Sequence, residues 1–375
     1  MKKYLYLTAA SIAMLGLASC SEDDGPSVPD PDYPTISEGA YVLNQGNFYN
    51  AVPGGLNVVD YNSSQTAKNV FEQVNGRSIG DTPQCGVAYG SKIYVGTMVS
   101  ETIEVLNRND YKSIKQIRLT EDGVDGTQPR CMIPHNGKIY MSMYDGYVAR
   151  FDTLTMKFDK AVKVGPNPEI MALRDGKLYV PNSDGMNWAV GYGKTASIVD
   201  VESMTVTGTF EVPENPAEFY SGEDGLYLLC KGNYKPETDP DFSPSALYKV
   251  EKTVENGKEV YENDLIAKAT IAALGNGVIY FVNQPFTNDV PKAEYYVYDM
   301  QSGEVSDWKV TAVDYPSNIA VDKVGGRILV SSYVMNGLYP SYDAPGYLNV
   351  YSTDNALVRK YEIGAGPTCI FFNTK

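Results

Sequence analysis

Histidine and paired cysteines are nearly absent from this chain of 375 residues. The one histidine is His135, and the five cysteines include no C-x-x-C pair. Cysteines without such spacing do not outline a disulfide framework, and a single histidine cannot build a histidine-rich metal site. We therefore expect neither a disulfide scaffold nor a metal centre.

Positive charge is also scarce. The chain has 31 lysine and arginine residues against 46 aspartate and glutamate residues, for a net charge of −15. A protein this acidic repels a polyanion, which excludes nucleic acid as a partner. The apolar run at residues 4–17 is too short to span a bilayer.

That apolar run belongs to a lipoprotein signal pattern. It follows the basic start Met1-Lys2-Lys3 and ends in Leu17-Ala18-Ser19-Cys20, which matches a lipobox. The pattern predicts a signal peptide over residues 1–19 and a lipid on Cys20, which becomes the first residue after cleavage. The alternative is a buried core helix with a chance cysteine.

A tether is expected next, over residues 20–38. Residues 21–25 (SEDDG) are serine and acidic residues, and residues 25–38 carry four prolines without apolar periodicity, as in an extended linker. The acidic run resembles the surface-export signal of Bacteroidetes lipoproteins; the alternative is a plain solvated linker. We expect a protein held at the outer membrane by its lipid alone, facing the cell exterior.

The remaining chain is a repeat of short β-strands. Residues 129–164 contain four β-type runs, with the two-residue hairpin turn Asn136-Gly137 between the first and second. The second run, GKIYM at residues 137–141, recurs as GSKIYV, GKLYV, GLYL, GVIYF and GRILV, at steps of 46, 39, 48, 53 and 49 residues. Four strands at such a period predict an all-β fold, a β-propeller with four-stranded blades.

The two ends complete the count of blades. Residues 366–372 (GPTCIFF) are a first strand with no successor, whereas residues 39–43, 55–61 and 66–74 supply three more strands. Joining them closes a seventh blade and removes the free sheet edges. We expect one seven-bladed domain over residues 39–375, its ring closed by N- and C-terminal strands.

The binding mouth is expected on the face that carries the long loops between second and third strands. These loops are residues 44–54, 182–195, 231–245, 283–293 and 331–346, and they are rich in aromatic and amide side chains. Such a surface suits a large, partly flat, amide-bearing ligand; the alternative is that tyrosines merely cap a β-rich protein with 30 of them. The candidate ligand-binding residues are Asn44, Gln45, Asn47, Phe48, Tyr49, Gln84, Arg130, Tyr144, Asp145, Asn182, Trp188, Asn233, Tyr234, Asn283, Gln284, Phe286, Tyr333 and Tyr339.

Catalysis has weaker support. His135 lies in a hairpin on the face opposite the mouth, which argues against a Ser-His-Asp arrangement. Carboxylates near the mouth could act as an acid–base pair, but some are expected there by chance among 46; they are Asp145, Glu169, Asp184 and Glu218. We expect no enzyme and no covalently bound cofactor.

The cysteines other than Cys20 fall on strands. Cys85, Cys131 and Cys369 each lie two residues after a blade-opening proline, on first strands of neighbouring blades, and Cys230 ends a second strand. We expect small buried residues near the ring centre. A redox or metal role is the alternative.

Several segments resemble a family of Bacteroidetes surface lipoproteins with YncE-like seven-bladed propellers. They are YVLNQGNFYNAVPGGLNVVD, RSIGDTPQCGVAYGSKIYV, PRCMIPHNGKIYMSMYDGYVARFD and GPNPEIMALRDGKLYVPNSDGM, and the resemblance covers roughly residues 39–372. Members of that family capture vitamin B12 and related corrinoids and pass them to a TonB-dependent outer-membrane transporter. The resemblance implies the same ligand class and partner. Alternatives are a siderophore or glycan receptor, a carboxylate-dependent glycan-acting enzyme, and a structural or adhesive protein.

Overall fold

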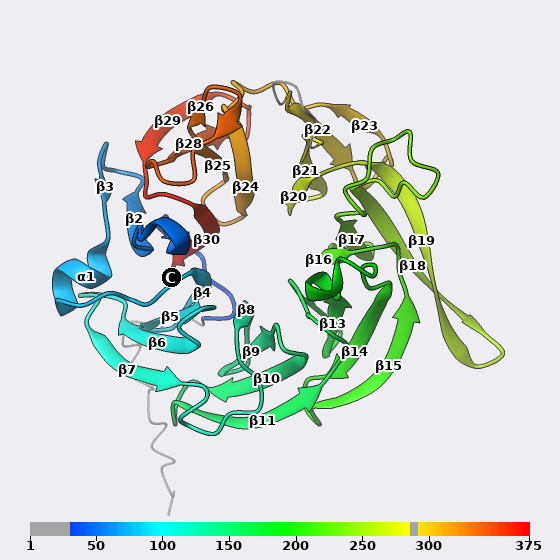
Figure 1. Cartoon of the computed structure of the whole chain (residues 1–375), viewed down its shortest axis with the longest axis horizontal. Helices are drawn as coiled ribbons and strands as arrows, with labels where there is room; N and C mark the ends of the chain where they lie inside the picture. The colour runs from blue at the N-terminus through cyan, green and yellow to red at the C-terminus, as the bar shows by residue number, and fades with distance from the viewer. Residues whose placement is uncertain (1–30, 286–291) are drawn as a thin grey trace, which may run out of the picture.

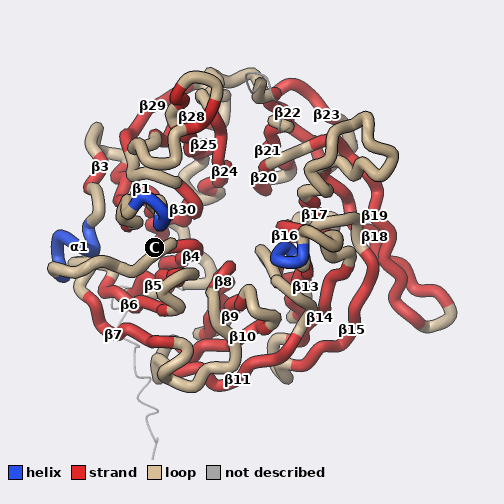
Figure 2. Tube along the Cα trace, viewed as in Figure 1, coloured by secondary structure: helices blue, strands red, loops and turns tan. Residues whose placement is uncertain are grey.

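Seven four-stranded antiparallel sheets form a closed ring in the computed structural model, which describes residues 31–285 and 292–375 (Figure 1). The chain is a seven-bladed β-propeller, as predicted. Figure 2 shows that strands make up most of the ring and that the helical turns are few and short. In the described part of the chain, no helix has the length and apolar character needed to cross a bilayer.

The blades follow one another along the chain, and we number them from the first complete one. Blade 1 is β4 (Pro83–Tyr89), β5 (Lys92–Thr97), β6 (Thr102–Asn107) and β7 (Ser113–Arg118); blade 2 is β8 (Pro129–His135), β9 (Lys138–Met143), β10 (Tyr147–Asp152) and β11 (Lys157–Lys163); blade 3 is β12 (Ala172–Arg174), β13 (Lys177–Asn182), β14 (Thr195–Asp200) and β15 (Thr205–Glu211). Blade 4 is β16 (Pro216–Ser221), β17 (Leu226–Cys230), β18 (Ala246–Glu255) and β19 (Lys258–Lys268); blade 5 is β20 (Ile271–Leu274), β21 (Val278–Asn283), β22 (Glu294–Asp299) and β23 (Val305–Asp307). Blade 6 is β24 (Tyr315–Asp322), β25 (Arg327–Tyr333), β28 (Tyr347–Ser352) and β29 (Leu357–Glu362), and its β25–β28 loop carries the small hairpin β26 (Met335–Asn336) and β27 (Tyr339–Pro340). Blade 7 is β30 (Pro367–Thr374), β1 (Ser37–Asn44), β2 (Gly55–Asp60) and β3 (Thr66–Ala67).

Turn chemistry fixes the hairpins. Between β8 and β9, Asn136 and Gly137 have φ values of 48° and 73°. Two successive positive φ angles define the type I′ turn, whose twist matches that of the two strands. The Asn-Gly hairpin predicted from the sequence is therefore confirmed, and His135 immediately precedes it on the face opposite the long loops.

The core lies between the blades. Seven clusters of buried apolar side chains occur among the described residues, one between each pair of neighbouring sheets. Between blades 1 and 2, for example, Tyr94 meets Phe151 edge to face at 5.9 Å between ring centroids. Burying a large apolar side chain stabilises a fold by about 1.5–3 kcal/mol. Each sheet is thereby held by both of its neighbours, which makes the ring rigid.

Blade 7 closes the ring with strands from both ends of the chain. β30 pairs antiparallel with β1, and Tyr41 lies opposite Phe371 in the register. Their rings stack with centroids 5.0 Å apart. Ahead of β1, the amides of Thr35 and Ile36 donate to the carbonyl oxygen of Lys375. The predicted closure is confirmed.

One predicted strand is largely wrong. Of residues 66–74, only Thr66–Ala67 (β3) is a strand, and the helix α1 (Val70–Asn75) takes the rest. Asn69 adopts a left-handed conformation at the helix start, and Gly76 ends the helix with a φ of 66°. Val70 and Phe71 are buried between blades 7 and 1. A short helix buries both side chains on one face, which an alternating strand could not do.

The face opposite the long loops is partly covered by the start of the described chain. Pro31, Asp32 and Pro34 line a recess of about 420 Å³ there, together with the ends of first strands. Asp32 accepts hydrogen bonds from the Tyr89 hydroxyl (3.1 Å) and the Asn136 amide (3.2 Å). We call this face the floor and the opposite one the mouth.

Candidate functional site

Two clefts open at the mouth, one on each side of the β17–β18 loop (residues 231–245). The first cleft, of about 770 Å³, separates this loop from the β13–β14 loop; Trp188, Tyr192, Asn233 and Phe242 are among its lining residues. The second cleft, of about 540 Å³, lies toward blade 5, and its lining includes Lys231, Tyr234, Asn283, Gln284 and Tyr315. Both volumes fall within the range of small-molecule sites.

Exposed aromatic side chains surround these clefts and continue around the mouth. Trp188 is 68 % exposed and Tyr234 is 61 % exposed, and Tyr192 meets Tyr234 edge to face at 6.0 Å. The other exposed ring-bearing residues of the mouth loops are Phe48, Tyr49, Tyr339 and Tyr342. Large apolar side chains left in water are informative when they gather in one place, because single ones are common on any surface.

A buried ion pair joins blades 2 and 3. Arg130 on β8 binds Glu169 through its Nε atom at 2.5 Å from Oε2, and its guanidinium lies 5.3 Å from the centre of the Tyr144 ring. Burial alone would lower the pKa of Arg130, but the charge and hydrogen bond of Glu169 raise it. Ser183 donates to the second carboxylate oxygen of Glu169 at 3.2 Å.

An unusual backbone bridge puts Glu169 in this position. Before β12 begins, Ile170 pairs in parallel with Glu218 of blade 4, donating its amide to the Ala217 carbonyl at 3.0 Å. This bridge joins blade 3 to blade 4. It brings the carboxylates of Glu169 and Glu218, from neighbouring blades, into the same region. The sequence predicted both carboxylates near the mouth without this connection.

Glu218 and Lys231 are further charged groups near this ion pair. Burial raises the pKa of Glu218 to about 7, a shift that Lys231 opposes and Glu169 reinforces. Burial lowers the pKa of Lys231, against the attraction of Glu218 and Glu169. Among the described residues neither group has an ion-pair partner within 4 Å, and Lys231 donates to the carbonyl oxygen of Thr270.

Several of the predicted amide residues form hydrogen bonds to other groups of the protein itself. Asn44 is 2 % exposed and donates to the Gly364 carbonyl, and Asn182 is 1 % exposed and donates to the Ser197 hydroxyl. Asn233 holds its own loop, accepting from the amide of Ser243 and donating to a carbonyl in the same loop. We therefore leave these three amides out of the contacts proposed below.

The other predicted residues are distributed around the mouth. Asn47 donates to Asp343 and caps the short helical turn η1 (Phe48–Asn50), and Asp145 accepts from the amide of Thr127. Asn283 donates to Glu294. Gln45 and Gln84 are partly exposed. Tyr144 is buried, and Tyr333 stacks edge to face on Tyr342 and Tyr315. Cys20 and Phe286 lie outside the described residues.

Sequence reasoning missed Lys231 and Tyr315 as members of the site. Lys231 directly follows the buried strand β17, where the corresponding position in blade 5 is the amide Gln284. A lysine at the mouth end of a second strand was the available signal, since lysine is rarely buried without a reason. Tyr315 opens β24 and belongs to an inner strand rather than to a long loop.

The four cysteines in the described part of the chain are free thiols, and Cys85, Cys131 and Cys369 lie on the first strands of neighbouring blades. Burial raises the pKa of Cys131 to about 12 and that of Cys369 to about 11, and both feel the charge of Glu218. Cys85 lies close enough to the other two thiols that each raises its pKa further. No group of three or more histidine, cysteine, aspartate or glutamate side chains suited to a metal ion occurs within residues 31–285 and 292–375.

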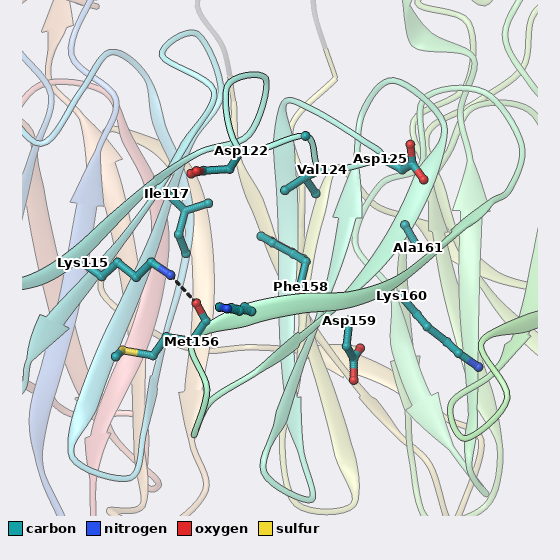
Figure 3. A pocket seen from close by; sticks show the side chains of 12 residues that line it. Lys115, Ile117, Asp122, Val124, Asp125, Met156, Phe158, Asp159, Lys160 and Ala161 are labelled. Atoms are coloured by element: carbon teal, nitrogen blue, oxygen red, sulfur yellow. Dashed lines mark hydrogen bonds between the residues drawn. The ribbon is translucent and has the colours of Figure 1, made fainter.

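A separate recess lies on the outer wall of the ring (Figure 3). It has about 380 Å³ and lies between β7 and β11, the outer strands of blades 1 and 2. Lys115 donates across it to the carbonyl oxygen of Met156 at 2.6 Å. None of the predicted binding residues lines this recess, so we do not include it in the site.

Comparisons with known proteins support the fold and do not assign a function. No protein-family model and no curated protein matches the sequence. Among solved structures, hydrazine synthase of Kuenenia stuttgartiensis has a TM-score of 0.52 at 13 % identity, covering 72 % of this chain and 77 % of that one. Apo AztD of Citrobacter koseri has a TM-score of 0.51 at 12 % identity, covering 90 % and 98 %. At such identities the likeness shows a β-propeller and no shared function.

Proposed function

We propose that this protein is a non-catalytic receptor that captures a corrinoid at its mouth and delivers it to a TonB-dependent transporter. The observation that carries the proposal is the gathering of exposed aromatic rings around two adjoining clefts. A corrinoid offers a flat macrocycle for stacking and many amide groups for hydrogen bonds, and both kinds of contact are available at this face.

The rigid ring suits tight binding. Each blade is packed on both sides, so the loops that form the clefts are carried by a frame that changes little on binding. Less conformational entropy is then lost when a ligand is immobilised, which raises affinity without any covalent chemistry. Siderophores and glycans would use the same surface and are the other ligand classes that we propose to test.

The anchor and the transporter are proposed from the sequence. The lipobox ending at Cys20 supports attachment to the outer membrane by a lipid, and the resemblance to corrinoid-capturing surface propellers supports the transporter partner. Replacing Cys20 by alanine should abolish incorporation of labelled palmitate and release the protein from the membrane fraction. Continued membrane association of this variant would contradict the anchor.

Ligand binding is tested by calorimetric titration of the purified full-length protein with cyanocobalamin. We expect a saturable one-to-one isotherm, and we expect Trp188→Ala and Tyr234→Ala each to weaken it by about 10-fold through lost stacking. The matched control is Tyr33→Ala, because Tyr33 is an equally exposed tyrosine (77 %) beside the floor recess. Absence of heat at micromolar concentrations would refute the corrinoid as ligand.

A second candidate function rests on one observation, the pKa of Glu218. A carboxyl group with a pKa near 7 that lies near a second carboxylate has the proton affinity that suits a general acid. A glycan-acting enzyme would show turnover that Glu218→Gln abolishes. Against it, Glu169 is already held by Arg130 and Ser183, so it is not free to act as a base or nucleophile.

A further inference from the structure

The inner wall of the second cleft is built from four residues of three blades. Lys231 follows β17, Thr270 precedes β20, Gln284 follows β21, and Tyr315 begins β24. The Thr270 hydroxyl donates to the Val282 carbonyl at 3.0 Å and accepts from the Gln284 amide at 3.1 Å. The backbone of Gln284 is therefore fixed, and its side chain lies in the wall.

Gln284 carries a hydrogen-bond donor with no partner. The side chain is only 9 % exposed, and its Nε2 atom, which bears two N–H groups, is buried without a hydrogen-bond partner in the part of the chain that the structure describes. An unsatisfied buried donor destabilises a fold, and native proteins keep few of them. A ligand in the cleft would satisfy this donor if the side-chain amide rotates to present its N–H groups to an acceptor atom of the ligand.

The same wall carries a lysine that has no ion-pair partner among the described residues. Of the four charged residues that line the cleft, three are lysines, although the chain as a whole is strongly acidic. Lys268 pairs with Glu237, and Lys235 pairs with Asp239 and Asp241. Lys231 has no ion pair within 4 Å among the described residues and gives a single hydrogen bond to a backbone carbonyl. An ammonium has three donors, so this group can accept further oxygen partners.

We propose that Lys231, Gln284 and Tyr315 form a subsite for an anionic oxygen group of the ligand, a carboxylate or a phosphate diester. The inference rests on the proposal that the mouth binds a small molecule, and it does not require that molecule to be a corrinoid. Charge-assisted hydrogen bonds from an ammonium, together with the orphan amide N–H, favour an anion over a neutral carbonyl. The rings of Tyr234 and Phe242 would contact the rest of the molecule.

The test follows the side-chain amide of Gln284 by nitrogen-15 NMR on the purified full-length protein, assigned by its loss in Gln284→Met. The probes are sodium acetate, sodium dimethyl phosphate and acetamide, at constant ionic strength. We expect a saturable shift with at least one anion, at least fivefold tighter than with acetamide; the tighter anion identifies the carboxylate or phosphate form. Lys231→Met should abolish the shift, and Lys258→Met, at the tip of the β18–β19 hairpin, should not.

Three results would overturn the proposal: no saturable shift with either anion, equal binding of acetamide, or a shift unchanged by Lys231→Met. If Lys231→Met does not fold, Gln284→Met decides instead. Removing an orphan donor should raise the melting temperature and eliminate the further rise that anions cause in the wild type, whereas a merely structural glutamine would lower the melting temperature on replacement. A silent cyanocobalamin titration beside a positive acetate titration would refute the corrinoid and keep the subsite.

Discussion

Glu218→Gln should change the pH dependence of folding in a defined direction. The carboxyl group has a pKa of about 7 in the folded protein, raised by burial, against an ordinary value of 4.5 in the unfolded chain. Between these two values the folded state therefore binds more protons than the unfolded state. The free energy of unfolding must fall as the pH rises through this window, since stability decreases with pH wherever the native state holds the extra proton.

The size of the effect follows from the two pKa values. A separation of about 2.5 pH units corresponds to about 3 kcal/mol of destabilisation once the group is fully ionised, and most of this develops between pH 5 and pH 8. Glutamine has the same shape and does not titrate. The lowered pKa of Lys231 acts in the opposite sense, because burial lets this lysine lose its proton more readily in the folded state than in the unfolded chain.

Urea denaturation of the wild type and Glu218→Gln at pH 5, 6, 7 and 8 measures this difference. We expect the variant to gain about 2–3 kcal/mol relative to the wild type across the series, with most of the gain between pH 5 and pH 7. If the free energies of unfolding of the two proteins change with pH in parallel, ionising Glu218 does not destabilise the fold. That result would refute its buried position beside Glu169. A change of the opposite sign would refute it as well.

Three further perturbations test the frame of the ring. Phe371→Ala should lower the free energy of unfolding by about 3–5 kcal/mol in urea, because it removes the ring stacked on Tyr41 at the closure; a loss below about 1 kcal/mol would contradict the closure as a main source of stability. Arg77→Met removes the guanidinium that lies 2.8 Å from the fully buried Glu104, to which Ser113 and Gln116 also donate, and should cost about 3 kcal/mol in the same assay; a loss near zero would contradict a stabilising role of this ion pair. Cys131 should react with iodoacetamide at pH 8 more than about 100-fold slower than a free thiol, followed by mass spectrometry; labelling at the free-thiol rate would show that it is not buried.

The repeat made the fold predictable. A glycine turn followed by an alternating strand such as Lys138–Met143 recurs at a nearly constant period, and each blade needs the same turn chemistry and the same inward apolar residues. The closure was predictable for the same reason, because the unpaired first strand at the C-terminus and the missing first strand at the N-terminus are complementary. The helix α1 was not predictable in this way. Its buried residues Val70 and Phe71 pack toward the next blade, and this contact is not part of the repeat.

The site was predictable only as a face of the molecule. Gln284 and Asn182 both lie at the mouth ends of second strands, as the repeat predicted. The side-chain amide of Gln284 has a donor without a partner, whereas that of Asn182 donates to the Ser197 hydroxyl. The role proposed for Lys231 depends on its place between blades 4 and 5 and on the nearby carboxylate of Glu218. These features depend on contacts between different blades, and no single repeat unit encodes them.

Hydrogen–deuterium exchange of the full-length protein with and without saturating cyanocobalamin shows both whether this ligand binds and where it binds. We expect slower exchange only at the mouth, in the β13–β14 and β17–β18 loops (residues 183–194 and 231–245). Exchange in the floor hairpins and in the outer recess between β7 and β11 should not change. Unchanged exchange throughout, or slowing at the floor or the outer recess alone, would contradict this expectation.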